Sequence, residues 1–272
     1  MLNFISFGSG SSGNCYYLFT ATDGLLIDTG VGLRTLKKEF KDYGLSMSSV
    51  NNVLITHDHA DHVKSVGCIS NDYKLPVYST RKVHSGILRN YCVQRKVPAE
   101  YTKYIEKGVA AEIGEFTVTP FAVPHDSTDN VGYFIENGGV AFCIMTDAGC
   151  VTEEMAAYIG RANYLVIEAN HDEEMLKNGP YPPYLKSRIL GDNGHLSNKS
   201  CGEAVAANMT ERLHAIWLCH LSEDNNHPEL ARKTVESILA DHGITVGEGL
   251  LLEVLKRKTP TGIFELGADS IL

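Results

Sequence analysis

The segment Thr56-His57-Asp58-His59-Ala60-Asp61-His62 follows the apolar run Val53-Leu54-Ile55. Three histidines and two aspartates within six residues are costly to bury in a core, and an ordinary solvated segment would contain lysine or glutamate. Imidazole and carboxylate groups together suit Zn, Mn or Fe. The ends of strands are also where open α/β sheets place their sites. The segment therefore predicts a metal site at the end of a β-strand.

Other residues with metal-ligand side chains follow further apolar runs. His125, Asp147 and His220 each come directly after a strand-like stretch. A divalent ion takes about four to six ligands, so the histidine-rich segment needs partners from elsewhere in the chain. Together these residues form a predicted set of seven ligands, enough for two divalent metal ions (Zn, Mn or Fe): His57, His59, Asp61, His62, His125, Asp147 and His220.

The composition is typical of a globular protein, with 272 residues of which 43% are hydrophobic and 21% charged. No run approaches the ~18 apolar residues that a membrane span requires, and no basic residue precedes Arg34, so no signal peptide is predicted. The seven cysteines are scattered without a C-x-x-C pair, which argues against a disulfide framework. We therefore expect a cytoplasmic protein without a membrane partner. Its oligomeric state is left open.

Charge is unevenly distributed along the chain. The formal net charge of −9 by itself disfavours a nucleic-acid partner. Residues Lys64 to Lys107, however, contain nine lysines and arginines against three acidic residues. Such a stretch is ordinarily a solvated face, and it becomes a candidate for contacts with phosphate groups only if a site lies nearby.

The pattern of apolar residues predicts an α/β protein. In the first half of the chain we expect a helix at 33–43 and strands at 3–7, 15–20, 25–28, 53–56, 77–79, 115–123, 131–136 and 140–145. In the second half we expect helices at 152–159, 198–211 and 228–241, strands at 164–168 and 215–219, and a loop at 179–194. No repeat or linker interrupts the pattern, so we expect one domain over 1–255, with 256–272 as a final strand or a tail.

The segment Gly8-Ser9-Gly10-Ser11-Ser12-Gly13 matches the G-x-G-x-x-G pattern of dinucleotide-binding sites, with Asp28 twenty residues beyond Gly8. In those sites the third glycine opens a helix whose N-terminus holds the pyrophosphate. Residues 14–19 are strand-like instead, so no dinucleotide is expected. A tight hairpin turn is the better interpretation, although its hydroxyls and amides could still contact a ligand.

The ordered motifs from Asp28 to His220 resemble those of the metallo-β-lactamase fold superfamily. The resemblance implies a four-layer αβ/βα sandwich with the metals at one edge. It implies one metal bound by His57, His59 and His125, and a second bound by Asp61, His62 and His220. Asp147 would then bridge the two ions, and Asp28 would orient a ligand without binding metal.

Three further segments narrow the resemblance. Gly194-His195-Leu196-Ser197-Asn198 is similar to the extra histidine motif of the RNase Z-like and nuclease branches, where that histidine assists phosphodiester cleavage. Glu168-Ala169-Asn170-His171-Asp172 and the opening segment 6–14 resemble the WalJ/VicX-type (YycJ-like) bacterial proteins. This group implies a DNA exonuclease linked to cell-wall homeostasis or genome maintenance.

Short connections exclude two neighbouring families. Only 21 residues separate His125 from Asp147, which leaves no room for the tRNA-gripping arm of RNase Z, and only 72 separate Asp147 from His220, too few for a β-CASP cap. The protein must therefore bind a polymer with its own core. The candidate substrate contacts are Ser11, Asn14, Asn170, Arg89, Arg95 and Lys96.

The function expected from these residues is phosphodiester hydrolysis by a metal-bridging hydroxide, with DNA as the expected substrate. Asp61 would orient the hydroxide, and His195 would protonate the leaving group or stabilise its charge. Two alternatives stay open. One is a small-molecule hydrolase on the same scaffold: a cyclic-phosphate diesterase, a lactonase or a thioesterase. The other is a metal-bound regulatory protein without turnover.

Overall fold

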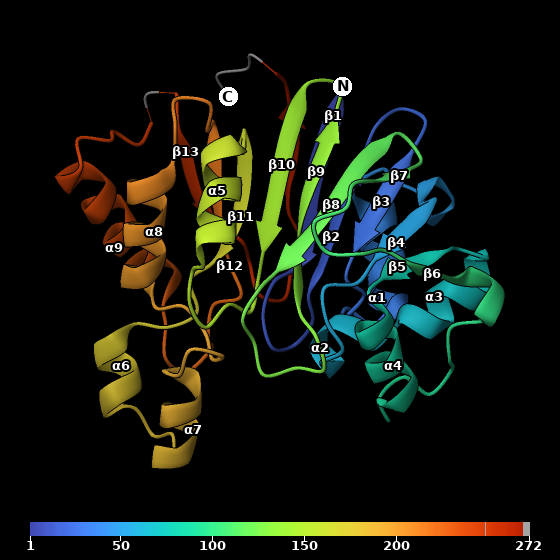
Figure 1. Ribbon diagram of the computed structural model, residues 1–272, viewed down its shortest axis with the longest axis horizontal. Helices are drawn as coiled ribbons and strands as arrows, with labels where there is room; N and C mark the ends of the chain where they lie inside the picture. The colour runs from blue at the N-terminus through green and yellow to red at the C-terminus, as the bar shows by residue number, and fades with distance from the viewer. Residues whose placement is uncertain (248, 269–272) are drawn as a thin grey trace. The chain divides into compact units, whose positions relative to one another are not determined.

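The computed structural model describes residues 1–247 and 249–268 and is shown in Figure 1. The chain forms two compact units. Unit 1 contains Met1–Pro120, Ser127–Val131 and Lys256–Gly267, and unit 2 contains Phe121–Asp126 and Gly132–Leu255. Among the described residues, none of the helices combines the length and the apolar composition needed to cross a bilayer.

The sheet of unit 1 has seven strands in the order β14-β1-β2-β3-β4-β5-β6. The strands are β1 (Leu2–Gly8), β2 (Cys15–Phe19), β3 (Gly24–Ile27), β4 (Asn52–Leu54), β5 (Val77–Ser79), β6 (Thr102–Tyr104) and β14 (Thr261–Leu266). Strands β3 to β6 are parallel, with Ile27 paired to Leu54, so the loops after β3 and β4 leave from the same edge. That edge is where Asp28 and the histidine-rich segment lie.

Helices cover one face of this sheet. They are α1 (Leu33–Asp42), α2 (Ala60–Val63), α3 (Val66–Tyr73) and α4 (Arg81–Arg89), with short 3₁₀ turns at Met47–Ser49 and Ala99–Tyr101. Helix α1 buries Leu36 and Phe40 against Phe7, as its spacing predicts, while its lysines remain exposed. The sequence did not predict α2, which begins within the metal-ligand segment, or α3 and α4, which follow it. Of these helices α4 carries residues of the basic stretch, namely Arg81, Lys82 and Arg89.

The second sheet has the order β13-β12-β11-β10-β9-β8-β7. Its strands are β7 (Ala111–Ile113), β8 (Phe116–Ala122), β9 (Val131–Asn137), β10 (Val140–Met145), β11 (Tyr164–Glu168), β12 (Ala215–Cys219) and β13 (Leu251–Val254). Strands β10 to β13 are parallel. Their carboxyl ends therefore bring the residues after β10, β11 and β12 to one edge of unit 2.

The helices of unit 2 are α5 (Glu153–Arg161), α6 (Glu173–Asn178), α7 (Pro183–Ile189), α8 (Asn198–Asn208) and α9 (Pro228–Asp241). Apolar residues of α5, α8 and α9 pack on β11 and β12 in one core cluster, which Figure 1 places on the same side of these strands. The expected loop at 179–194 is wrong in part, because it contains α7. Pro183 is tolerated there since it occupies the first turn, where a helix needs no amide donor.

The C-terminal stretch is partly a strand. Residues Thr261–Leu266 form β14, which pairs antiparallel with β1 in unit 1. The last four residues of the expected strand or tail, 269–272, lie outside the described residues.

Candidate metal centre

The segment Thr56–His62, here called the histidine loop, follows β4 in unit 1 and is held by a buried carboxylate. His62 Nδ1 donates a hydrogen bond of 2.7 Å to Asp28 Oδ2. The Thr56 amide donates to Asp28 Oδ1 (2.9 Å), and the Thr56 hydroxyl donates to Asp28 Oδ2 (2.8 Å). Because Nδ1 carries the proton, Nε2 of His62 is the nitrogen that can accept a hydrogen bond or bind a metal.

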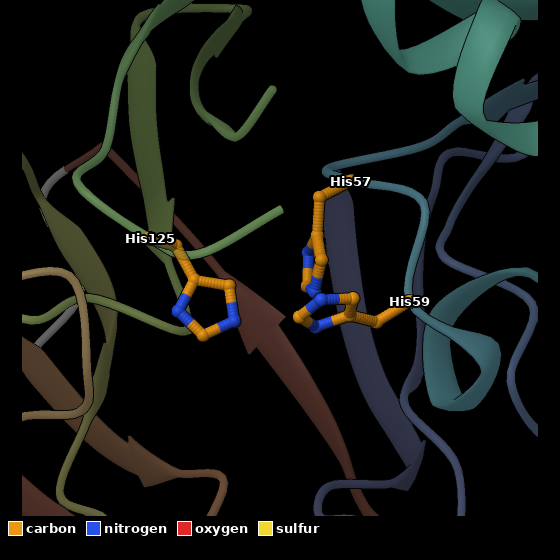
Figure 2. A group of neighbouring side chains, drawn as sticks. All are labelled: His57, His59 and His125. Atoms are coloured by element: carbon orange, nitrogen blue, oxygen red, sulfur yellow. The ribbon is translucent and has the colours of Figure 1, made fainter. Parts of the chain in front are cut away.

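The other histidines of this loop lie against each other. The rings of His57 and His59 are 4.7 Å apart between centroids, and those of His57 and His62 are 4.0 Å apart. Figure 2 shows His57 and His59 side by side on this loop; the third side chain drawn, His125, comes from the loop after β8. His57 is fully buried. Helix α2 begins directly after His59, which places Asp61 in its first turn.

Asn14 touches the histidine loop from the turn after β1. The side-chain Nδ2 of Asn14 donates to His62 Nε2 (2.9 Å) and to Asp61 Oδ2 (3.3 Å), and the backbone amide of Asn14 donates to the Asp61 carbonyl (2.8 Å). Ser11 is exposed at the tip of the same turn. The predicted contact Asn14 thus lies beside two predicted ligands.

Asp58 is a residue of this loop whose role the sequence does not reveal. Its carboxylate accepts from the Thr128 hydroxyl (2.6 Å) and amide (3.1 Å), and its carbonyl accepts from Asn90 Nδ2 (2.7 Å). A Cβ on Gly86 would stand 2.0 Å from the Asp58 carboxylate, so helix α4 approaches as closely as it does only because residue 86 is glycine. The basic helix α4 is therefore fixed directly against the histidine loop.

In unit 2, four residues bring potential ligand atoms within 4.8 Å of one another: Asp147, Glu168, His195 and His220. We call them the Glu168 cluster. Glu168 Oε1 accepts from Nδ1 of His195 (2.8 Å) and of His220 (2.9 Å). Its Oε2 accepts from the amides of Ala148 (2.9 Å) and Leu196 (3.1 Å). One fully buried carboxylate thus orients two imidazole rings.

These contacts set the protonation of the cluster. Burial raises the pKa of Glu168, but the charge of His195 and the hydrogen bonds from His195 and His220 outweigh it and hold this pKa at about 2. Burial lowers the pKa of His195, and the neighbouring Glu168 and Asp147 more than offset it, so the pKa of His195 is raised. Glu168 is accordingly an anion that favours a protonated His195. In the sequence Glu168 is visible only as part of a motif, which does not reveal this role.

His125 is held by the loop that precedes α8. Its Nδ1 donates to the Gly194 carbonyl (3.1 Å), and its Nε2 lies 3.7 Å from Asp147 Oδ1. As in His62, the hydrogen bond at Nδ1 leaves Nε2 as the ligand atom. The neighbouring Asp126 forms a two-pronged ion pair with Arg188 of α7. Helix α7 therefore supports the loop that carries His125.

Backbone geometry marks three residues of the site. Asp28, Asp147 and His220 have φ angles of 58°, 55° and 53°. Asp28 and His220 directly follow a strand, and one residue separates Asp147 from the end of β10. Left-handed conformations are uncommon outside glycine, and they are concentrated at functional sites. Each strand end therefore turns sharply enough to aim its side chain at the sheet edge.

Three of the remaining predicted contacts, Arg95, Lys96 and Asn170, have partners within the protein. Arg95 pairs with Asp72 (2.5 Å), and Lys96 Nζ donates to the Asn90 carbonyl (2.8 Å) at the end of α4. Asn170 is buried, and its Nδ2 donates to the His220 carbonyl (2.8 Å). Arg89 lies in the last turn of α4. These contacts place Asn170 and Lys96 in supporting positions, and Arg89 is exposed to solvent.

The donor set fits divalent transition metals. Imidazole nitrogens and carboxylate oxygens supply it, and hydrogen bonds at Nδ1 fix the ring orientation of His62, His125 and His220.

Comparison with known proteins agrees with these features. Residues 24–217 match the β-lactamase superfamily domain. The chain is 36% identical to the exodeoxyribonuclease YycJ of Bacillus anthracis, over 96% of this chain and 98% of that protein. It is 33% identical to the exodeoxyribonuclease WalJ of Streptococcus pneumoniae, over 95% and 96% of the two chains.

Among solved structures, the metallo-β-lactamase fold protein YhfI of Bacillus subtilis has the same fold, with a TM-score of 0.69 and 17% identity over 96% of this chain and 98% of that one. The fold class and the class of metal-dependent hydrolase expected from the sequence are thereby confirmed. The chain therefore belongs to the metallo-β-lactamase superfamily, in the group of the YycJ- and WalJ-type proteins.

Proposed function

We propose that this protein is a DNA exonuclease that hydrolyses phosphodiester bonds with two divalent metal ions. The observation that carries the proposal is the Glu168 cluster, in which one buried carboxylate holds both a ligand histidine and a protonatable histidine. Similarity to relatives named as exodeoxyribonucleases, along almost the whole chain, supports DNA as the substrate.

The metal ligands follow the sequence assignment. The first ion would be held by His57, His59 and His125, the second by Asp61, His62 and His220, and Asp147 would bridge them. The hydrogen bonds at Nδ1 of His62, His125 and His220 support this assignment, since each directs Nε2 toward a ligand position. Zn, Mn and Fe all accept such a set.

The metals and the protein side chains have separate tasks in the mechanism. When bound, the ions supply an activated water and positive charge for the phosphate oxygens. Asp61 orients the attacking oxygen through its carboxylate. His195, whose raised pKa comes from Glu168, holds a proton on the nitrogen that faces away from Glu168 and gives it to the leaving oxygen.

Helix α4 carries Arg89, which we propose contacts the phosphate backbone of DNA. Its attachment to Asp58 keeps Arg89 at a fixed position relative to the histidine loop. Arg95 and Lys96 would add positive charge while keeping their protein partners, and Ser11, Asn14 and Asn170 complete the proposed contacts. We also place the protein in the cytoplasm, where its substrate is found and where seven unpaired cysteines stay reduced.

A panel of substrates tests the proposal. The protein is loaded with Mn or Zn and given end-labelled duplex DNA, bis-p-nitrophenyl phosphate, a lactone and a thioester, with Asp61→Ala as the control variant. We expect metal-dependent degradation of DNA that disappears in Asp61→Ala. Turnover of the lactone or thioester with intact DNA would overturn the proposal in favour of a small-molecule hydrolase, and cleavage of the small diester alone would indicate a cyclic-phosphate or similar substrate.

A further inference from the structure

Two segments from opposite ends of the chain meet beside the histidine loop in unit 1. One is the turn Gly8–Gly13, here called the serine turn, and the other is Lys256–Lys258, the basic turn. The amide of Ser9 donates to the carbonyls of Lys256 (3.1 Å) and Arg257 (3.3 Å). A Cβ on Gly10 would stand 3.2 Å from Cγ of Arg257, so the stem of this arginine packs directly on the serine turn.

The serine turn is also bound to the predicted metal ligands through Asn14. The Gly10 amide donates to Asn14 Oδ1 (2.8 Å), while Asn14 Nδ2 donates to His62 Nε2 (2.9 Å). The Asn14 amide donates to the Asp61 carbonyl (2.8 Å). A single residue thus connects the basic turn and the serine turn to the ligands of the second metal position.

The serine turn is rigid and close-packed at its base. The Gly13 amide donates to the Gly10 carbonyl (2.9 Å), which closes the turn. Gly13 has a φ of 152°, and a Cβ there would stand 2.7 Å from the Gly30 carbonyl, so only glycine fits. Ser11 and Ser12 are exposed at the tip. The backbone of the turn is therefore closed and tightly packed at its base, while the side chains of Ser11 and Ser12 are exposed to solvent.

The chemistry of the two turns is that of an anion site. The serine turn contains only glycine and serine, the basic turn contains only lysine and arginine, and neither has a carboxylate. Lys256 and Lys258 are exposed, and Arg257 is half-buried. Hydroxyl donors on a closed turn, next to a segment of cationic side chains, are groups that bind phosphate.

We propose that the serine turn and the basic turn together bind a phosphate group of the DNA substrate that neighbours the one being cleaved. The inference rests on the proposed function, because it takes DNA as the ligand. It gives a role to the glycine-rich motif, which lacks the helix that dinucleotide binding requires. It also gives a role to the start of the C-terminal stretch, which strand pairing alone leaves unexplained.

The test uses the full chain and measures binding separately from turnover. Fluorescence anisotropy in EDTA gives the Kd of a labelled duplex with 5′-phosphate, 3′-phosphate or hydroxyl ends, over a range of salt concentrations. The variants are Arg257→Gln and Lys258→Gln. The matched control is Lys41→Gln, which removes an exposed positive charge from α1.

We expect each test variant to bind DNA about tenfold more weakly, and the slope of log Kd against log salt to fall by about 1 for each cation removed. The control should match wild type. A greater loss on one phosphorylated end would identify a terminal phosphate as the ligand, and an equal loss on all ends would identify an internal one. Unchanged affinity and salt slope in both test variants would overturn the inference.

Turnover separates this inference from the proposed function. If wild type with Mn leaves DNA intact, the proposed function fails whatever the binding data show. If wild type degrades DNA and the variants degrade it equally well at limiting substrate, the proposed function stands and the phosphate site is wrong. With bis-p-nitrophenyl phosphate, which has no second phosphate, we expect the variants to lose less than with DNA.

Discussion

The histidine loop and the Glu168 cluster both contain imidazole groups held by a buried carboxylate, but they draw these groups from the chain in different ways. The loop takes its potential ligands from seven consecutive residues, whereas the cluster takes its four from the ends of different strands and from the segment before α8. Each is held by one buried carboxylate, but Asp28 orients a single imidazole and Glu168 orients two. In the proposed mechanism Glu168 would therefore connect metal binding to proton transfer, whereas Asp28 would serve metal binding alone.

The largest effect is expected from Asp147→Ala. Asp147 Oδ1 lies 3.7 Å from His125 Nε2 and 3.5 Å from His220 Nδ1, so the substitution takes away the proposed bridging ligand next to two other proposed ligands. We expect loss of bound metal and of all DNA degradation above background. Metal content by atomic emission, together with the cleavage rate, checks this; a variant that keeps two ions per chain would contradict the bridging role.

His195→Ala should separate the two functions of the Glu168 cluster. His195 is a proposed proton donor and not one of the seven ligands, so metal content should match wild type. We expect turnover to fall by about 100- to 10,000-fold, the usual contribution of a general acid. An undiminished rate with metal retained would remove His195 from the mechanism.

Glu168→Gln and Asp28→Asn form a matched pair of nearly isosteric changes. Substitution of a residue that hydrogen-bonds to a metal ligand typically lowers metal affinity or activity by about 10- to 100-fold. We expect Asp28→Asn to weaken metal affinity within that range and, once metal is saturating, to restore most of the rate. Glu168→Gln should weaken metal affinity and also remain slow at saturating metal, since His195 loses its anionic partner. Chelator competition and cleavage rates at saturating metal measure the two effects. Full rescue of Glu168→Gln by metal would mean that the two carboxylates are equivalent.

The smallest effect is expected where the histidine loop meets α4. Asn90→Ala deletes one hydrogen bond to the Asp58 carbonyl. It should lower the free energy of unfolding by about 0.5–1.5 kcal/mol and leave metal content unchanged. Urea denaturation and metal analysis check the two parts. A loss of metal would show that α4 supports the ligands themselves and not only the proposed DNA contact.

The same contrast explains what the sequence could and could not predict. The histidine loop is dense enough to be recognised from spacing alone, and the strand ends before His125, Asp147 and His220 are visible as apolar runs. The role of Glu168 cannot be recognised in this way, because a carboxylate that accepts hydrogen bonds from distant histidines has no characteristic spacing in the sequence. Its partners lie 27 and 52 residues away.

Other misses have equally physical causes. The proline-rich stretch 179–194 hides α7, since proline is acceptable in a first turn. The sequence does not show which lysines and arginines of the basic stretch have partners within the protein. In the structure Arg95 is paired with Asp72, and Lys96 binds the end of α4. Contact between the serine turn and the basic turn joins the two ends of the chain, and no local pattern encodes it.

One plasmid, used as a closed circle and as a linear duplex, tests whether the protein is an exonuclease. The Mn-loaded protein is incubated with the plasmid as a covalently closed circle and after linearisation, with His195→Ala beside wild type. We predict that wild type shortens the linear form progressively from its ends and leaves the circle intact, and that His195→Ala does neither at a comparable rate. Degradation of the circle, or an intact linear form in the presence of bound metal, would contradict the proposal.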